Sequence, residues 1–139
     1  MAPPKTRLDR LVTVRERTEE SALETLARAQ TGRDHAAQRL AGAQQSARVD
    51  ARAPGAAELW LLEEHAHVRA LQQVARAREQ LAQAETHEAT ARAGYTAAHR
   101  QAEVARRAQE KKRAEIVSDR EKRERKALDE LATLRFNSR

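Results

Sequence analysis

The side chains of this chain that could perform chemistry are its histidines and its adjacent glutamates. The histidines are His35, His65, His67, His87 and His99. His65 and His67 are two residues apart, which places them about 200° apart on a helix, so they cannot chelate one ion together. Glu63 and His67 have the i, i+4 spacing of an ordinary surface pair. We therefore predict that the chain holds no metal.

The glutamate pairs, Glu19 with Glu20 and Glu63 with Glu64, lack the features of catalytic dyads. Adjacent carboxylates on an exposed helix have no neighbour that would shift their pKa as acid–base catalysis requires. None of the four serines lies in a nucleophile elbow, and the chain has no phosphate-binding glycine loop and no cysteine. We expect no catalytic residue and no cofactor, and so a protein that is not an enzyme.

The elements that must position these side chains are long helices. Of the 139 residues 40% are hydrophobic, but 30 are alanine, and phenylalanine, tryptophan and tyrosine occur once each. Side chains large enough to fill a compact interior are therefore scarce. Four glycines and three prolines are too few for the turns of a multi-stranded protein. The composition argues against a pocketed enzyme and favours an all-α protein.

The charge balance is basic but mixed, with 22 arginines and 5 lysines against 21 acidic residues and a formal net charge of +6. It permits binding to nucleic acid or anionic lipid without requiring either, because acidic residues alternate with basic ones. The apolar run Leu59–Leu62 is far shorter than the ~20 residues that span a bilayer. Met1–Lys5 lacks the apolar core of a signal peptide. We expect a soluble, cytoplasmic protein.

One segment breaks the helical pattern, and it contains Pro54 and Gly55. Proline removes a backbone donor and clashes with the preceding turn, and glycine adopts backbone angles that other residues avoid. The break predicts a single coiled-coil hairpin domain over residues 1–139. Its helix 1 covers about 6–51, its turn about 52–56 and its helix 2 about 57–136.

Both predicted helices carry a heptad seam of small apolar residues, found by steps of four and three. Nine of twelve seam positions in helix 1 are apolar; the positions are Leu8, Val12, Arg15, Glu19, Ala22, Leu26, Ala29, Arg33, Ala36, Leu40, Ala43 and Ala47. Nine of ten are apolar in helix 2; these are Val74, Ala77, Leu81, Ala84, Glu88, Ala91, Tyr95, Ala98, Ala102 and Ala105. Beyond Ala105 the same phase gives one apolar residue in eight.

The end of this seam predicts an unpaired C-terminal segment. A hairpin that turns near Pro54 places residue i opposite a residue near 108 − i, so helix 1 would end opposite residue ~103. An overhang of about 35 residues would follow. Residues 104–139 have 12 basic and 7 acidic side chains, and i, i+4 pairs such as Glu121 with Arg125 would keep them helical. The predicted fold is all-α, an antiparallel two-helix coiled-coil hairpin with a C-terminal helical overhang.

The most apolar patch follows the predicted turn and consists of Trp60, Leu61 and Leu62 with Val68 and Leu71. We expect it to close the tip of the hairpin against Leu40 and Ala47. The alternative is a docking surface, because three adjacent helical positions cannot all face one partner helix.

Two terminal segments resemble those of one known family. Leu8–Ala22 is similar to the opening of FliJ-type proteins, with a leucine-rich turn before an Arg-Glu-rich stretch, and Arg123–Ala132 is similar to their closing pattern. The resemblance covers the whole chain, including the break and the position of Trp60. It implies a stalk of a flagellar or type III secretion apparatus that sits in a hexameric export ATPase and links it to the membrane export gate. Export chaperones are further partners of some members, and the location implied is cytoplasmic, peripheral at the inner-membrane secretion apparatus.

The resemblance also implies contact residues. The positions expected to bind the ATPase are Leu8, Leu11, Arg15, Glu19, Glu20, Glu124, Leu128, Asp129, Glu130 and Leu131. Those expected to face the gate are Trp60, Leu61 and Val68, although His65–His67 stand where the family usually has larger aromatic residues. The sequence leaves the flagellar and injectisome versions open. It also leaves open two other functions, a self-associating structural coiled coil and a basic helical nucleic-acid-binding protein.

Overall fold

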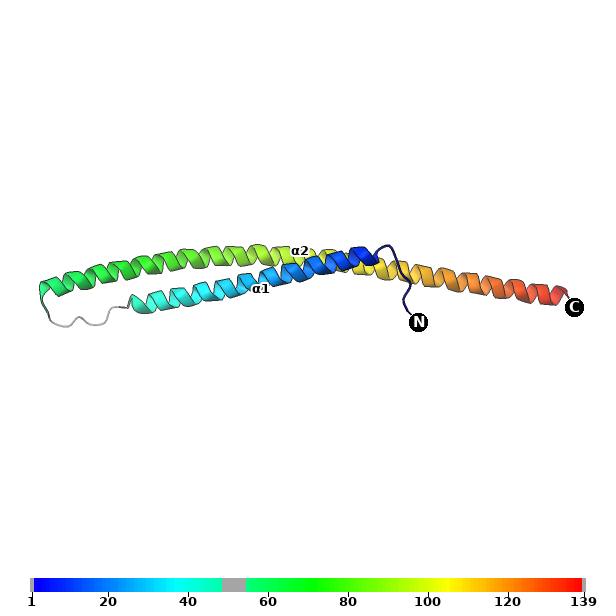
Figure 1. Cartoon of the computed structure of the whole chain (residues 1–139), viewed down its shortest axis with the longest axis horizontal. Coiled ribbons are helices and arrows are strands. Elements are labelled where there is room, and N and C mark those ends of the chain that lie inside the picture. Colours follow the sequence, from blue (N-terminus) through cyan, green and yellow to red (C-terminus); the bar gives the residue numbers. More distant parts are fainter. Residues whose placement is uncertain (1, 49–54, 139) are drawn as a thin grey trace. The chain divides into compact units, whose positions relative to one another are not determined.

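The computed structural model of the chain describes residues 2–48 and 55–138. They form two helices, α1 over Asp9–Ser46 and α2 over Ala57–Asn137 (Figure 1). No strand occurs in these two ranges. The predicted fold class is confirmed, because the two helices pack against each other as an all-α helical hairpin. Residues 52–54 of the predicted turn, Pro54 among them, lie outside the described residues.

A capping arrangement sets the start of α1. The backbone N–H of Thr6 donates to Asp9 Oδ2 over 3.1 Å, and the Thr6 hydroxyl donates to Asp9 Oδ1 over 2.6 Å. The side chain of Asp9 thus satisfies groups that precede the helix, as in a capping box. α1 therefore begins at Asp9 rather than at residue 6, and it ends at Ser46.

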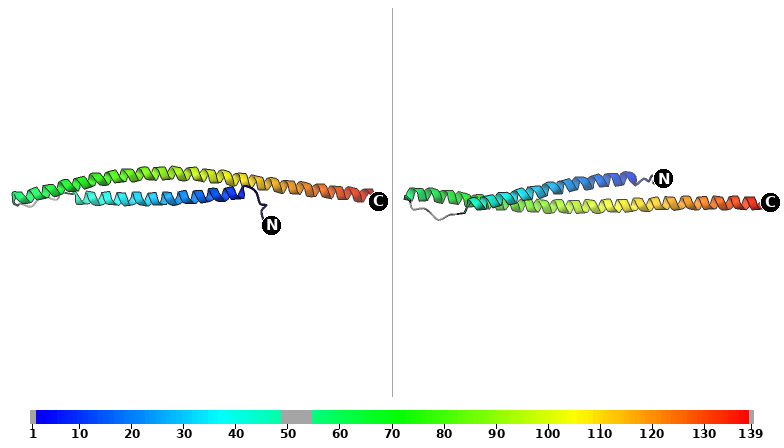
Figure 2. Two further views of the ribbon diagram at one scale, coloured as in Figure 1. Left: turned by 45° about the horizontal axis from the view of Figure 1, so that its top comes forward. Right: turned by 90° about the horizontal axis from the view of Figure 1, so that it is seen from below.

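The chain consists of two compact units, each built from a part of α1 and a part of α2. Unit 1 comprises Met1–Glu20 and Ala97–Arg139, and unit 2 comprises Ser21–Thr96. In unit 2 the cyan part of α1 lies beside the green part of α2, as the views of Figures 1 and 2 show. In unit 1 side-chain hydrogen bonds join the N-terminal part of α1 to α2.

The predicted heptad seam forms the buried core of both units. Every buried side chain in the described ranges stands at a seam position. In unit 1 these are Val12, Ala98, Ala102 and Ala105. In unit 2 they are Leu26, Ala29, Ala36, Val74, Ala77 and Glu88. Most are alanines, so the helices can approach closely but bury little apolar area.

The pairing register differs from the prediction by about ten residues. In unit 2 Arg33 Nη1 lies 3.0 Å from Glu88 Oε2, whereas a turn at Pro54 would have placed Arg33 opposite residue 75. In unit 1 Asp9 meets Gln109 rather than residue 99. The seams set this register, since Ala47 at the end of one seam then lies opposite Val74 at the start of the other.

The C-terminal overhang is consequently shorter than the predicted 35 residues. α1 reaches as far as Arg113, whose Nη2 lies 3.3 Å from Asp9 Oδ1. Ile116 and Ser118 are half-buried, and every residue from 119 to 138 is exposed. The unpaired segment is therefore about 20 residues long, because the shifted register brings more of α2 against α1.

The predicted closure of the tip by Trp60, Leu61 and Leu62 is wrong. These side chains are 46%, 62% and 65% exposed. With Arg33 opposite Glu88, Leu40 comes opposite a residue near 81, too far along α2 to cover Trp60. The part of α2 that precedes Val74 therefore presents its apolar side chains to solvent.

Candidate protein-binding sites

The described residues carry networks of charged side chains and exposed apolar patches. In residues 2–48 and 55–138, no group of three histidine, cysteine, aspartate or glutamate side chains could hold a metal. Within the same ranges, neither helix has a stretch apolar enough to cross a membrane. The features that remain are networks of charged side chains and exposed apolar patches, which unit 1 and unit 2 each carry.

Asp9 ties the first turn of α1 to α2 in unit 1. Gln109 Nε2 donates to Asp9 Oδ1 over 2.8 Å, and Arg113 Nη2 lies 3.3 Å from the same oxygen. Hydrogen bonds from the Thr6 hydroxyl and backbone N–H, followed by the one from Gln109, hold the pKa of Asp9 well below its usual range. The same carboxylate therefore both caps α1 and fixes its position on α2.

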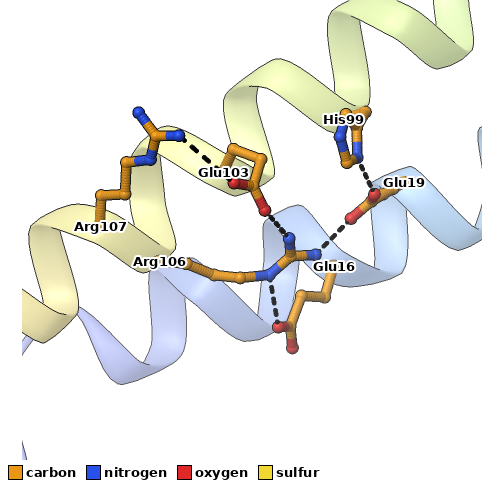
Figure 3. Close-up of polar contacts among 6 residues, drawn as sticks. All are labelled: Glu16, Glu19, His99, Glu103, Arg106 and Arg107. Atoms are coloured by element: carbon orange, nitrogen blue, oxygen red, sulfur yellow. Dashed lines mark hydrogen bonds and ion pairs between the residues drawn. The ribbon is translucent and has the colours of Figure 1, made fainter.

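Arg106 is the centre of a second network in unit 1, shown in Figure 3. Its Nε lies 3.2 Å from Glu16 Oε1, and its Nη2 lies 2.6 Å from Glu19 Oε2, so it joins two turns of α1. Its Nη1 also donates to Glu103 on α2. One guanidinium thus contacts three carboxylates. These contacts, with Glu16 first, raise the pKa of Arg106 above its ordinary value.

The pKa of Glu19 is lowered, contrary to the prediction for adjacent carboxylates on an exposed helix. Its Oε1 lies 2.5 Å from His99 Nδ1, and its Oε2 accepts a hydrogen bond from Arg106. The contact with His99, followed by the charge of Arg106, holds the pKa of Glu19 below its ordinary value. The expectation was wrong because Glu19 stands at the seam and faces α2, whereas Glu20 is exposed.

The charged network of unit 2 lies inside the seam. The Glu88 carboxylate is buried, with Arg33 Nη1 at 3.0 Å and Arg92 Nη2 at 2.8 Å. Arg33 also contacts Asp34 at 2.8 Å. A buried carboxylate requires such partners, because removing its charge from water is costly. The two polar seam positions of this unit therefore meet each other rather than alanine.

All ten residues expected to bind the ATPase lie in unit 1, but the structure does not bring them together. Leu8, Arg15 and Glu19 face α2 and are half-buried, whereas Leu11 and Glu20 are exposed. The other five are fully on the surface of the overhang; they are Glu124, Leu128, Asp129, Glu130 and Leu131. The two groups form separate patches, since Asp9 lies near residues 109–113 and the second group begins about 16 Å further along α2.

The three residues expected to face the gate lie in unit 2, and all are exposed. Leu61 and Val68 are seven residues apart and share one face of α2, and Trp60 with Leu71 adjoins that face. Their exposed fractions run from 44% to 62%. Adjacent exposed apolar side chains of this kind are typical of interaction surfaces.

Sequence reasoning missed most of the polar contacts between the helices. Asp9, His99, Arg106, Gln109 and Arg113 were not singled out as contact residues. Three of them, His99, Arg106 and Arg113, lie off the heptad phase of helix 2, so hydrophobic periodicity does not indicate them. In the observed register, Asp9, Glu16 and Glu19 in the first three turns of α1 lie opposite the basic residues that follow Ala98 on α2.

Comparison with known proteins gives one match. The family model described as flagellar FliJ protein matches residues 4–139. No curated protein and no solved structure is significantly similar to the chain.

Proposed function

Because the chain belongs to the FliJ family, whose members are components of the flagellar export apparatus, we propose that it is the central stalk of that apparatus. The chain catalyses no reaction. It inserts into the hexameric export ATPase, stimulates or couples that enzyme, and links it to the membrane export gate. Export chaperones are further partners. The stalk works in the cytoplasm, peripheral at the inner-membrane secretion apparatus.

The observation that carries the proposal is the exposed helical segment of unit 1 over residues 119–137. It stays helical without a partner helix, and it holds weak ion pairs such as Arg125 Nη2 with Glu121 Oε2 at 4.0 Å. Exposed pairs of this kind contribute little to stability. Their charged groups can therefore exchange one partner for another, as a shaft requires when the subunits of a ring change conformation around it.

The proposed ATPase contacts form two patches on unit 1. Leu128 and Leu131 of the overhang are 65% and 60% exposed and lie on one face of α2. They supply an apolar anchor, with Glu124, Asp129 and Glu130 as charged neighbours. The patch at the start of α1 consists of Leu8, Leu11, Arg15, Glu19 and Glu20. The two patches are separated by about 16 Å along α2, so the ring would contact the stalk at two levels.

The proposed gate contact is the apolar stripe of unit 2. Trp60, Leu61 and Val68 present large apolar side chains to solvent, and aromatic side chains are common anchors of protein interfaces. Glu63 and Glu64 lie between them on α2. We assign this stripe to the gate because it uses residues separate from the ATPase patches.

The test is ATP turnover by the purified cognate hexamer, with and without the full chain. We expect turnover to rise on addition of the chain, and the chain to co-migrate with the hexamer. The variant Leu128→Glu with Leu131→Glu should lose most of the stimulation, because it places charge where the anchor would be buried.

The matched control is Leu23→Glu, since Leu23 is also an exposed leucine of the helical pair, 49% exposed, but belongs to neither proposed patch. It should stimulate as the unmodified chain does. Absence of both stimulation and co-migration would contradict the stalk function. Equal losses from Leu23→Glu and from the overhang variant would contradict the assigned contact residues.

A further inference from the structure

Unit 1 has an open groove between α1 and α2, on the other side of the seam from Arg106. Its volume is about 320 Å³. Leu11 and Arg15 of α1 form one wall; the other wall and the floor are formed by Arg100, Gln101, Val104, Ala105 and Ala108 of α2. On α2, Val104 and Arg106 point about 200° apart, so the groove and the Arg106 network occupy opposite edges of the helical pair.

The apolar atoms of this groove are exposed to solvent. Val104 is 68% exposed and Leu11 is 42% exposed, although both adjoin the buried seam. Ala105 and Ala108 keep the floor shallow, so a further element can approach both helices closely. The groove therefore has the form of a third position in a coiled coil, into which a helix can insert aliphatic side chains.

The charges around the groove are of one sign. Of the described residues that line it, two are arginines and none is a carboxylate. Arg15 Nη1 donates to Gln101 Oε1 over 2.6 Å, which holds this guanidinium at the edge of the groove. Arg100 is exposed on the opposite wall. The carboxylates of Glu16, Glu19 and Glu103 lie instead around Arg106.

We propose that this groove binds an amphipathic helix of a partner protein, one whose short aliphatic stripe is flanked by carboxylates. The aliphatic side chains would cover Val104 and Leu11, and the carboxylates would pair with Arg15 and Arg100. The wall from Arg100 to Ala108 is about 12 Å long, which corresponds to two to three helical turns of the partner. The groove shares Leu11 and Arg15 with one proposed ATPase patch, but the inference holds for a helical partner outside the ATPase and is tested without that enzyme.

The test uses a fluorescein-labelled synthetic helix of about 20 residues, with leucines at heptad a and d positions and glutamates beside them. Its binding to the full chain is followed by fluorescence anisotropy. The control peptide has lysine in place of each glutamate. We expect saturable binding of the acidic peptide and at least about tenfold weaker binding of the basic one.

Two variants of the chain locate the binding site. Val104→Glu and Arg100→Glu should each weaken binding of the acidic peptide about tenfold, because each places a carboxylate in the groove. Val14→Glu and Arg10→Glu are matched controls, since both residues are exposed in unit 1 and do not line the groove. They should bind the peptide as the unmodified chain does. Circular dichroism would verify that all four variants remain helical.

Three outcomes would overturn the inference. The first is no saturable binding of the acidic peptide to the unmodified chain, and the second is equal binding of the acidic and basic peptides. The third is dimerisation of the unmodified chain in sedimentation that Val104→Glu abolishes, because a second copy would then occupy the groove. Stimulation of the ATPase is a separate measurement, so failure of the stalk function and failure of this inference are distinguishable.

Discussion

Arg33 and Glu88 face each other across the seam of unit 2, with Nη1 and Oε2 3.0 Å apart. Each is a polar residue in an otherwise mostly apolar row of heptad positions. Glu88 is 6% exposed, and Arg92 supplies its second cationic partner. A polar pair within a coiled-coil seam specifies register, because a shift of either helix would leave a buried charge opposite an apolar side chain.

Charge reversal tests this role of Arg33 and Glu88. Arg33→Glu places two carboxylates together and should lower the melting temperature, followed by circular dichroism, by roughly 5 °C. Adding Glu88→Arg should recover part of that loss, because the charges across the seam are again opposite, although the arginine at this position then lies beside Arg92. The control is Arg28→Glu, which breaks an exposed pair with Glu24 at 3.7 Å; its effect should stay small. A double variant less stable than Arg33→Glu alone would contradict the pairing.

The close approach of the helices depends on alanine at the centre of the seam. Ala102 is 0% exposed, so Ala102→Leu would force the helices apart. We expect the free energy of unfolding in urea to fall by about 1–3 kcal/mol. Ala97→Leu is the matched control, because Ala97 is exposed on the same helix and leucine is a good helix former. If Ala102→Leu is as stable as the control, α2 does not pack through Ala102.

Gly94 lies within α2 and has open space around it. A Cβ atom added there would meet nothing within 4 Å, and the same holds for Gly32 and Gly42 in α1. These glycines therefore do not serve a close approach of the helices. Gly94→Ala should raise the free energy of unfolding by about 0.5–1 kcal/mol, because alanine reduces the freedom of the unfolded chain. A fall in stability in urea unfolding would show that Gly94 contacts something at this position.

The networks of unit 1 should make the hairpin sensitive to acid. The pKa values of Asp9 and Glu19 are lower in the folded chain than their ordinary values of 3.8 and 4.5. At pH values between the folded and the ordinary pKa of each group, the unfolded chain binds more protons than the folded chain. The stability from these groups is therefore fully present above the ordinary pKa values and is lost as the pH falls below them. The melting temperature should therefore decrease as the pH is lowered from 5 towards 3.

The variant Glu19→Gln isolates one part of this acid response. It should be less stable than the unmodified chain at neutral pH and should lose less stability between pH 5 and 3, because position 19 no longer takes up a proton. Glu20→Gln is the control, since Glu20 is the exposed neighbour, and it should follow the unmodified chain. Identical acid profiles for Glu19→Gln and the unmodified chain would rule out the proposed role of the Glu19 contacts.

The core of the hairpin could be predicted from the sequence, whereas its register could not be taken from the turn. Val74, Ala102 and the other buried residues follow from heptad periodicity, because burial in a two-helix pair depends on the face of the helix. The register was placed by assuming that the chain reverses at Pro54, although α2 continues from Val74 back to Ala57 beyond the end of the α1 seam. Matching Ala47 with Val74 would have given the observed pairing.

The polar contacts were less accessible to sequence reasoning than the core. His99 and Arg106 lie beside the seam, and the predicted register, which was wrong by about ten residues, would have given them different partners on α1. The heptad phase places Glu19 at a seam position, whereas the prediction for adjacent carboxylates groups it with Glu20 on an exposed helix, and only the first of these describes Glu19 correctly. For such side chains, the position relative to the opposite helix decides which hydrogen-bond and ion-pair partners they meet. Hydrophobic periodicity alone does not give the register that sets this position.

The antiparallel register decides which residues of the two helices meet, and distances between pairs of spin labels in unit 2 test it directly. The chain has no cysteine, so single cysteines can be introduced at the exposed positions Thr31, Arg78 and Thr90. The structure predicts a short distance between labels at 31 and 90. It predicts a clearly longer distance between labels at 31 and 78, because Arg78 lies about 18 Å from Thr90 along α2. A shorter distance for 31 and 78, as pairing around Pro54 would give, or a long distance for both pairs would contradict the hairpin described here.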